Sequence, residues 1–144
     1  MEFKKIGECL AAKSDWVVTE VSDFEVHVKI PLEGERSQHV RISQVGKFDA
    51  QGIQSEVLEF HSVSVEVPKG QMITPKLAYD LLKTNARMMF GAWGIGELDG
   101  KQYLAIYDSA LLATLTPEDL VATVTVLATE ADRLEQDWDG QDIF

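Results

Sequence analysis

The sequence has very little cysteine, since Cys9 is the only one among 144 residues. One cysteine cannot form an intramolecular disulfide, so we expect the reducing setting of the cytoplasm. The first residues interleave charged and apolar side chains and lack the continuous apolar segment of a signal peptide. No apolar run approaches the roughly 20 residues that a membrane-spanning helix needs. The sequence therefore predicts a cytoplasmic protein that does not contact a membrane.

Basic side chains are also scarce. Thirteen Lys and Arg oppose 24 Asp and Glu, which gives a formal net charge of −11. This charge repels phosphate backbones and anionic lipids, so we expect neither nucleic acid nor a membrane surface as a partner. Hydrophobic residues make up 45% of the chain, enough for one ordinary core. We expect a single domain over residues 1–138 and an acidic tail over residues 139–144, with an apolar end at Ile143 and Phe144 that docks.

The first half of the chain predicts one helix followed by strands. Apolar residues at helical spacing predict a helix over residues 2–13. Alternating or β-favouring residues predict four strands, over residues 16–21, 24–30, 39–43 and 56–67. Gly46 is expected to end the third of these strands. In the fourth strand the apolar residues change face, which indicates either a bulge near His61 and Ser62 or partial cover on both faces.

The second half predicts two helices, and each begins with a Thr-Pro pair. Thr74 and Pro75 begin a helix over residues 74–84, because threonine caps helices and proline suits the first helical position. Thr116 and Pro117 begin a longer helix in the same way. Its apolar residues repeat at intervals of three and four, which is typical of a packed helix. They are Leu120, Val124, Leu127, Ala131, Leu134 and Trp138.

Two further strands lie between these helices. Residues 88–95 are apolar on both faces, so they predict a central or doubly covered strand. Asp99 and Gly100 predict a hairpin turn, and residues 102–107 form the returning strand. The order is helix, three or four strands, helix, two strands, helix. This order predicts an α+β domain, with a largely antiparallel sheet and helices packed on it.

Few residues point to catalysis. Cys9 has no catalytic motif around it and is expected to be a small, partly buried residue of the first helix. His27, His39 and His61 are expected to point outward from strands, and their spacing is not that of a zinc site. His27 and His39 nevertheless fall on one face of neighbouring strands, so a ligand site between them stays open.

Glycines and acids in the second half have simpler interpretations. Gly91, Gly94 and Gly96 do not match the dinucleotide-binding pattern, and glycine in a strand indicates that another group approaches closely. Acidic residues cluster towards the C-terminus, and we expect them to be solvated surface charge. They include Glu130, Asp132, Glu135 and Asp137.

Methionine and aromatic residues are concentrated in residues 88–95. One interpretation is that Met88, Phe90, Trp93 and Ile95 belong to the core. The other is that one face of this strand meets a partner or a second copy of the chain, since Met and aromatic residues are enriched at interfaces. We predict the second, with Phe90 and Trp93 as anchors.

The same region carries a family resemblance. Residues 81–87 contain the pattern Leu-Leu-x-x-Asn-Ala-Arg, followed by Phe90, Gly91 and a Thr-Pro-Glu helix start at residues 116–118. With these motifs the chain resembles the YbjN family and the wider group of type III secretion chaperone-like domains, most closely over residues 75–138. The resemblance implies a dimeric α+β protein without enzymatic activity and with no catalytic residue or cofactor. In such chaperones, apolar patches of a dimer hold an extended segment of a client protein.

These observations lead to one functional prediction and two alternatives. We predict a non-enzymatic protein-interaction module, chaperone-like or regulatory, that acts as a homodimer and binds a protein or peptide client. The first alternative is a small-molecule- or metal-binding α+β domain, possibly enzymatic, that uses the acidic surface and the histidines. The second alternative is a structural subunit of a larger assembly.

Overall fold

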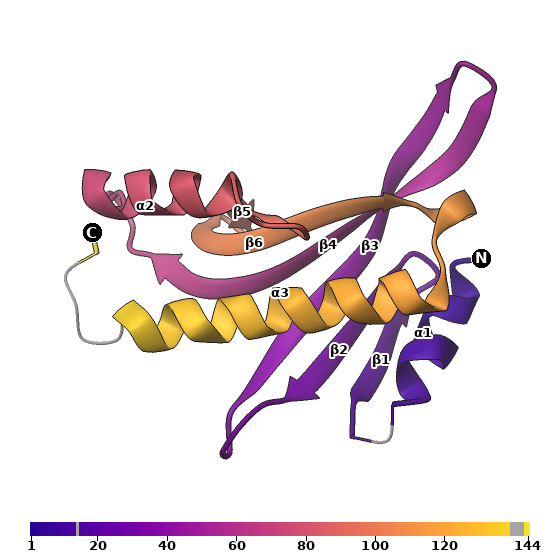
Figure 1. Ribbon diagram of the computed structural model, residues 1–144, viewed down its shortest axis with the longest axis horizontal. Coiled ribbons are helices and arrows are strands. Elements are labelled where there is room, and N and C mark those ends of the chain that lie inside the picture. The colour runs from indigo at the N-terminus through magenta and orange to yellow at the C-terminus, as the bar shows by residue number, and fades with distance from the viewer. Residues whose placement is uncertain (14, 139–142) are drawn as a thin grey trace.

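The frame of the protein is a six-stranded antiparallel sheet in the computed structural model, which describes residues 1–13, 15–138 and 143–144 (Figure 1). Its strands are β1 (Val17–Ser22), β2 (Glu25–Pro31), β3 (Ser37–Ala50), β4 (Ile53–Val67), β5 (Ala92–Leu98) and β6 (Lys101–Leu111). Their order across the sheet is β1-β2-β3-β4-β6-β5, and all neighbours are antiparallel. The helices are α1 (Lys4–Ala11), α2 (Pro75–Asn85) and α3 (Pro117–Trp138), with a short 3₁₀ turn, η1 (Leu112–Thr114), before α3. The predicted α+β class and antiparallel sheet are confirmed.

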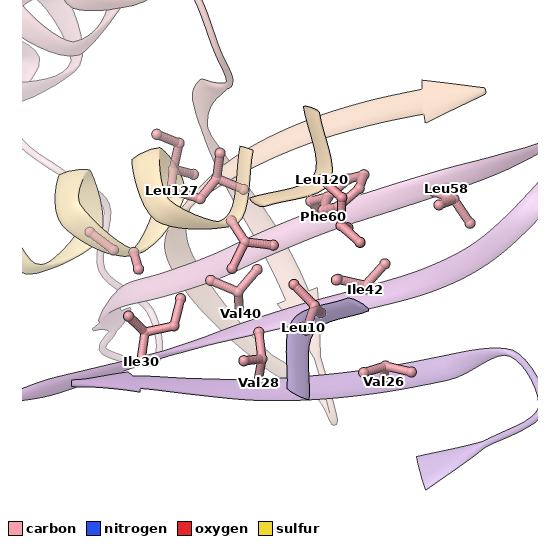
Figure 2. Close-up of a cluster of buried hydrophobic side chains, with 14 of the residues drawn as sticks. Leu10, Val26, Val28, Ile30, Val40, Ile42, Leu58, Phe60, Leu120 and Leu127 are labelled. Carbon is pink, nitrogen blue, oxygen red and sulfur yellow. The ribbon is translucent and has the colours of Figure 1, made fainter. Parts of the chain in front are cut away.

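The three helices lie on the same face of the sheet. α3 runs across the strands, and buried residues of α1, α2 and α3 belong to one core cluster with the strands (Figure 1). Figure 2 shows Leu10 of α1 and Leu120 and Leu127 of α3 among strand residues such as Val40 and Phe60, all fully buried. In the described part of the chain no helix covers the opposite face, which we call the open face.

The helix starts follow the sequence prediction. The Thr74 hydroxyl accepts a hydrogen bond from the Leu77 N–H at 3.3 Å, and the Thr116 hydroxyl accepts one from the Asp119 N–H at 3.1 Å. Each bond satisfies a backbone donor that has no partner within its own helix. Among the described residues, no helix combines the length and the apolar character that crossing a bilayer requires.

Register shifts in β3 and β4 alter the strands that the sequence predicts. β3 continues past Gly46 to Ala50, so the prediction that Gly46 ends this strand is wrong; instead the register shifts between Gln44 and Gly46. The extra residue lets pairing continue while the strand bends. In β4 the register shifts at Ser64, two residues beyond the predicted bulge, and this shift returns the following valines to the helix face. The far end of the β3–β4 hairpin projects from the body (Figure 1).

The predicted strand over residues 88–95 is wrong in its start and its place. β5 begins at Ala92 and is an edge strand, which among the described residues pairs only with β6. Met88 and Phe90 lie in the loop that precedes it. The apolar character of residues 88–95 therefore does not come from a strand covered on both faces. Residues 92–95 belong to β5, whereas residues 88–91 form a loop beside a groove.

The C-terminal segment is tied to the body at two places. Asp132, expected to be solvated, is 6% exposed and accepts hydrogen bonds from Arg36 Nε at 3.2 and 3.3 Å. Ile143 is 4% exposed, and its carbonyl oxygen accepts from the Thr74 N–H at 2.8 Å. The expected docking of the last two residues is thus present, whereas residues 139–142 of the predicted acidic tail lie outside the described residues.

Candidate functional site

The loop between α2 and β5 is shaped by Asn85 and Gly91. The Asn85 amide nitrogen donates to the Trp93 carbonyl at 3.1 Å, and its oxygen accepts from the Trp93 N–H at 2.6 Å. Gly91 has a φ of +78°, and a Cβ at this position would lie 3.1 Å from the Tyr107 carbonyl oxygen. Glycine suits both the conformation and the close approach. The two ends of the loop are therefore fixed by specific backbone contacts.

This loop and α3 enclose a groove that we call the methionine groove. Its volume is about 500 Å³. Met88 and Phe90 are half-buried, whereas Met89 is 90% exposed. Two arginines lie at the groove, and one of them, Arg133, donates to the Glu130 carboxylate. The groove is lined by Thr84, Arg87, Met88, Met89, Phe90, Val126, Glu130 and Arg133.

The four residues predicted at an interface do not share one surface. Met88 and Phe90 line the methionine groove. Trp93 is 8% exposed and belongs to the core cluster, so in a single chain it is unavailable as an anchor for a partner. Ile95 is 50% exposed on the edge strand β5. The first interpretation, core, therefore applies to Trp93, and the other three remain candidates for contact with a partner.

Charged residues gather on the open face around Glu25. Arg41 Nη2 donates to Glu25 Oε2 at 2.8 Å, and Arg41 Nε lies 2.7 Å from Oε1. His27 Nε2 lies 2.6 Å from the same Oε1. The hydrogen bond from Arg41, and after it that from His27, holds the pKa of Glu25 below its usual value of 4.5, although burial opposes this shift. Glu25 thus carries its negative charge in direct contact with Arg41.

A second group on the open face centres on His61. Its ring lies 5.6 Å from the Tyr107 ring, centroid to centroid, and its Nδ1 lies 3.4 Å from a Glu59 oxygen. Burial lowers the pKa of His61, with the nearby Glu59 charge acting in the opposite direction. Burial, and then the Glu59 charge, raises the pKa of Tyr107. At neutral pH this group therefore has one charge, the Glu59 carboxylate.

The strand glycines explain how Tyr107 is placed. A Cβ at Gly96 would lie 1.7 Å from the Tyr107 hydroxyl oxygen, and one at Gly94 would lie 3.4 Å from the ring. The Tyr107 ring therefore lies along β5 over both glycines. The expectation that these glycines admit a close approach is confirmed, and the group that approaches is Tyr107.

The remaining candidates have ordinary surroundings. Cys9 is half-buried in α1, as predicted. His27 and His39 both lie on the open face, where they pair with Arg41 and Lys29 across β2 and β3. His39 is exposed. Within the described ranges, no three His, Cys, Asp or Glu side chains are grouped so that they could hold a metal ion.

Sequence analysis missed the open-face groups although it placed their members correctly. The alternation in β2 and β3 puts Glu25, His27 and Arg41 on outward positions. Their contact depends on the register, in which His27 faces Arg41 and Arg41 faces His61. A hairpin register follows from the length of the connecting turn. The turn between β2 and β3 is therefore the sequence feature from which the contacts of Glu25 and His27 with Arg41 could have been predicted.

Comparisons with protein-family models, with curated proteins and with solved structures found no match to this chain. The resemblance to the YbjN family accordingly remains a prediction that rests on the motifs of residues 81–91 and 116–118.

Proposed function

We propose that this protein is a non-enzymatic protein-interaction module, chaperone-like or regulatory, that binds a protein or peptide partner through the methionine groove. The observation that carries the proposal is the groove itself, in which Met89 is 90% exposed beside Met88 and Phe90. Methionine side chains adapt their shape to different apolar partners. Aromatic residues, Met and Arg are also the types enriched where proteins meet.

The proposal includes a homodimer, as the family resemblance implies. β5 is an edge strand, and exposed edges pair with other chains. The N–H and C=O of Trp93 point away from β6, because the Asn85 side chain binds both of them. The backbone of Ile95 and of Glu97 points the same way in an antiparallel ladder, beyond the reach of Asn85. This open edge, with the exposed Ile95, is the surface that we propose for the second copy.

Partner binding is tested on an array of short peptides that vary in apolar and charged content. We expect the wild-type protein to bind a subset rich in apolar residues. Met89→Glu should lose at least about tenfold in affinity, because a charge in an apolar contact must be desolvated. Met72→Glu is the matched control, since Met72 is 81% exposed and lies outside the groove.

Two results would contradict the proposal for the groove. One is the absence of any peptide class bound above background. The other is an equal loss of binding in Met89→Glu and Met72→Glu, which would show that negative charge alone weakens binding wherever it is placed.

The alternative function as a small-molecule-binding domain is favoured by a different observation, the charged and aromatic groups of the open face. The metal-binding form of this alternative has no support among residues 1–13, 15–138 and 143–144, which contain no suitable cluster of ligands.

A further inference from the structure

The open face contains a hollow of about 300 Å³ that the proposed protein-binding function does not use. Residues of β2, β3, β4, β5 and β6 line it, and we call it the open-face hollow. The residues that the argument needs are Glu25, Arg41, Glu59, His61, Glu97 and Tyr107, which all line it. A hollow of this size is at the small end of ligand-binding pockets.

The charges around the hollow sum to a negative value. Among its lining residues, all within the described part of the chain, Arg41 is the one Lys or Arg. Its guanidinium is bound by both oxygens of Glu25, so its charge is already neutralised. Glu59 remains, and the His61 ring beside it is kept neutral near pH 7 by burial. Glu97 also lines the hollow, but alternation along β5 places its side chain on the face of Trp93 and Ile95. An anion would therefore be repelled, and a cation would be attracted.

Aromatic surfaces form part of the same wall. Tyr107 is held in place from two sides, by the His61 ring at 5.6 Å and by the bare backbone of Gly94 and Gly96. Tyr103 also lines the hollow. The face of a tyrosine ring attracts cations, and a ring that is already fixed loses little freedom when a ligand binds. Carboxylates beside aromatic rings favour an organic cation over a hydrated metal ion.

We propose that the open-face hollow is a binding site for an alkylammonium or guanidinium group, held between the Glu59 carboxylate and the ring of Tyr107. The cation is either a free small amine or the side chain of a lysine or arginine in another protein. This site lies on the face of the sheet opposite the helices and has no lining residue in common with the methionine groove.

The test is a titration of the full chain, followed by NMR of the His61 and Tyr107 ring resonances. The probes are n-butylammonium and n-butylguanidinium, with butanoate and n-butanol as the anionic and neutral matches of the same length. We expect saturable shifts with the two cations and none with the other two probes. A blocked peptide with one central lysine separates the two sources. Binding as tight as that of butylammonium indicates a protein side chain, and exclusion of the peptide indicates a free amine.

Two variants then locate the site. Glu59→Gln should weaken binding of butylammonium by about fivefold, the effect of one nearby charge in a solvated setting. Glu35→Gln removes the same charge from the exposed β2–β3 loop and should leave the affinity unchanged. Circular dichroism checks that each variant is folded.

The proposal is overturned if butanoate or butanol binds as tightly as the cations, or if no probe gives a saturable shift. It is also overturned if Glu59→Gln and Glu35→Gln weaken binding equally, because the cations would then respond only to the overall charge of −11.

Discussion

Asn85 shows how much a single polar side chain contributes to this fold. It ends α2, and its amide also binds both backbone groups of Trp93, as a neighbouring strand would. This pairing closes the edge of β5 at the point where the strand begins. It also fixes the distance between α2 and β5, and therefore the position of the loop with Met88 and Met89. The asparagine of the Leu-Leu-x-x-Asn-Ala-Arg pattern thus has a structural role.

Replacement of Asn85 should clearly lower the free energy of unfolding. Asn85→Ala removes two hydrogen bonds and leaves the Trp93 backbone groups without a partner, so we expect a loss of about 1–3 kcal/mol in the free energy of unfolding. Asn85→Asp keeps an acceptor for the Trp93 N–H but brings a carboxylate against the Trp93 carbonyl, so it should not restore the stability. Urea unfolding measures both, with Lys83→Ala on the exposed side of α2 as the control. If Asn85→Ala unfolds at the same urea concentration as wild type, the side chain does not have this role.

At the scale of elements, the central strands are joined through ionisable side chains on the open face. Glu25 of β2 binds Arg41 of β3, and Arg41 pairs directly with His61 of β4. His61 in turn lies beside Glu59 on its own strand and Tyr107 on β6. Three neighbouring strands and β6 therefore share a group of charges whose state depends on pH.

Stability should fall as the pH falls. The pKa of His61 is lowered from 6.5 by burial, so the unfolded chain binds a proton more readily than the folded chain. The stabilisation is complete above pH 6.5 and is lost as the pH falls below it. Glu25, whose pKa is lowered from 4.5 chiefly by Arg41, adds a second loss below pH 4.5.

Urea unfolding midpoints measured between pH 7.5 and pH 5 give the contribution of His61 to stability. This range extends about one unit or more to each side of the ordinary histidine pKa. His61→Gln should flatten this pH dependence. His39→Gln, at an exposed position of β3, should keep it. A wild-type midpoint that does not change over this range would contradict the burial of a neutral His61.

The sequence predicts the elements better than it predicts their edges and contacts. The Thr-Pro pairs and the Asp99-Gly100 turn act locally, so their predictions are confirmed, and both turn residues have a positive φ. The bulge at Ser64 lies two residues beyond its predicted position, since that position depends on pairing with β6. The strand predicted over residues 88–91 is wrong because an apolar run has the same pattern beside a groove as inside a sheet.

The candidate sites follow the same division. The sequence identified the apolar concentration at Met88 and Phe90, and the structure places both in one groove. It did not indicate that Trp93, unlike these two residues, belongs to the core, because the identity of a residue does not tell whether its side chain is buried. The open-face hollow depends on five strands, so no single stretch of sequence could indicate it.

For the whole molecule, the helices cover one face and leave the two edge strands available. β1 and β5 form the edges of the sheet, and each carries exposed apolar side chains, among them Val17, Val21 and Ile95. The Asn85 amide occupies only the first outward position of β5. If the homodimer forms through β5 as proposed, a substitution on this edge should weaken it, whereas a similar substitution on β1 should not.

Light scattering after size-exclusion chromatography should give twice the 16.0 kDa mass of one chain. Ile95→Lys should shift the protein towards the single-chain mass, because a charged residue on an edge opposes pairing. Val21→Lys makes the same kind of change on β1 and should leave the mass unchanged. A wild type of 16.0 kDa, or a dimer that only Val21→Lys dissociates, would exclude the β5 edge as the interface.

The position of all three helices on one face also determines which amino-acid substitutions the sheet can accept. Exposed outward positions such as Lys29 of β2 and His39 of β3 are not involved in packing, since the core needs only the alternate residues that face the helices. Substitutions there alter the chemistry of the surface with little cost to folding. The open face is thus a region in which new specificity can be selected or engineered while the hydrophobic core stays constant.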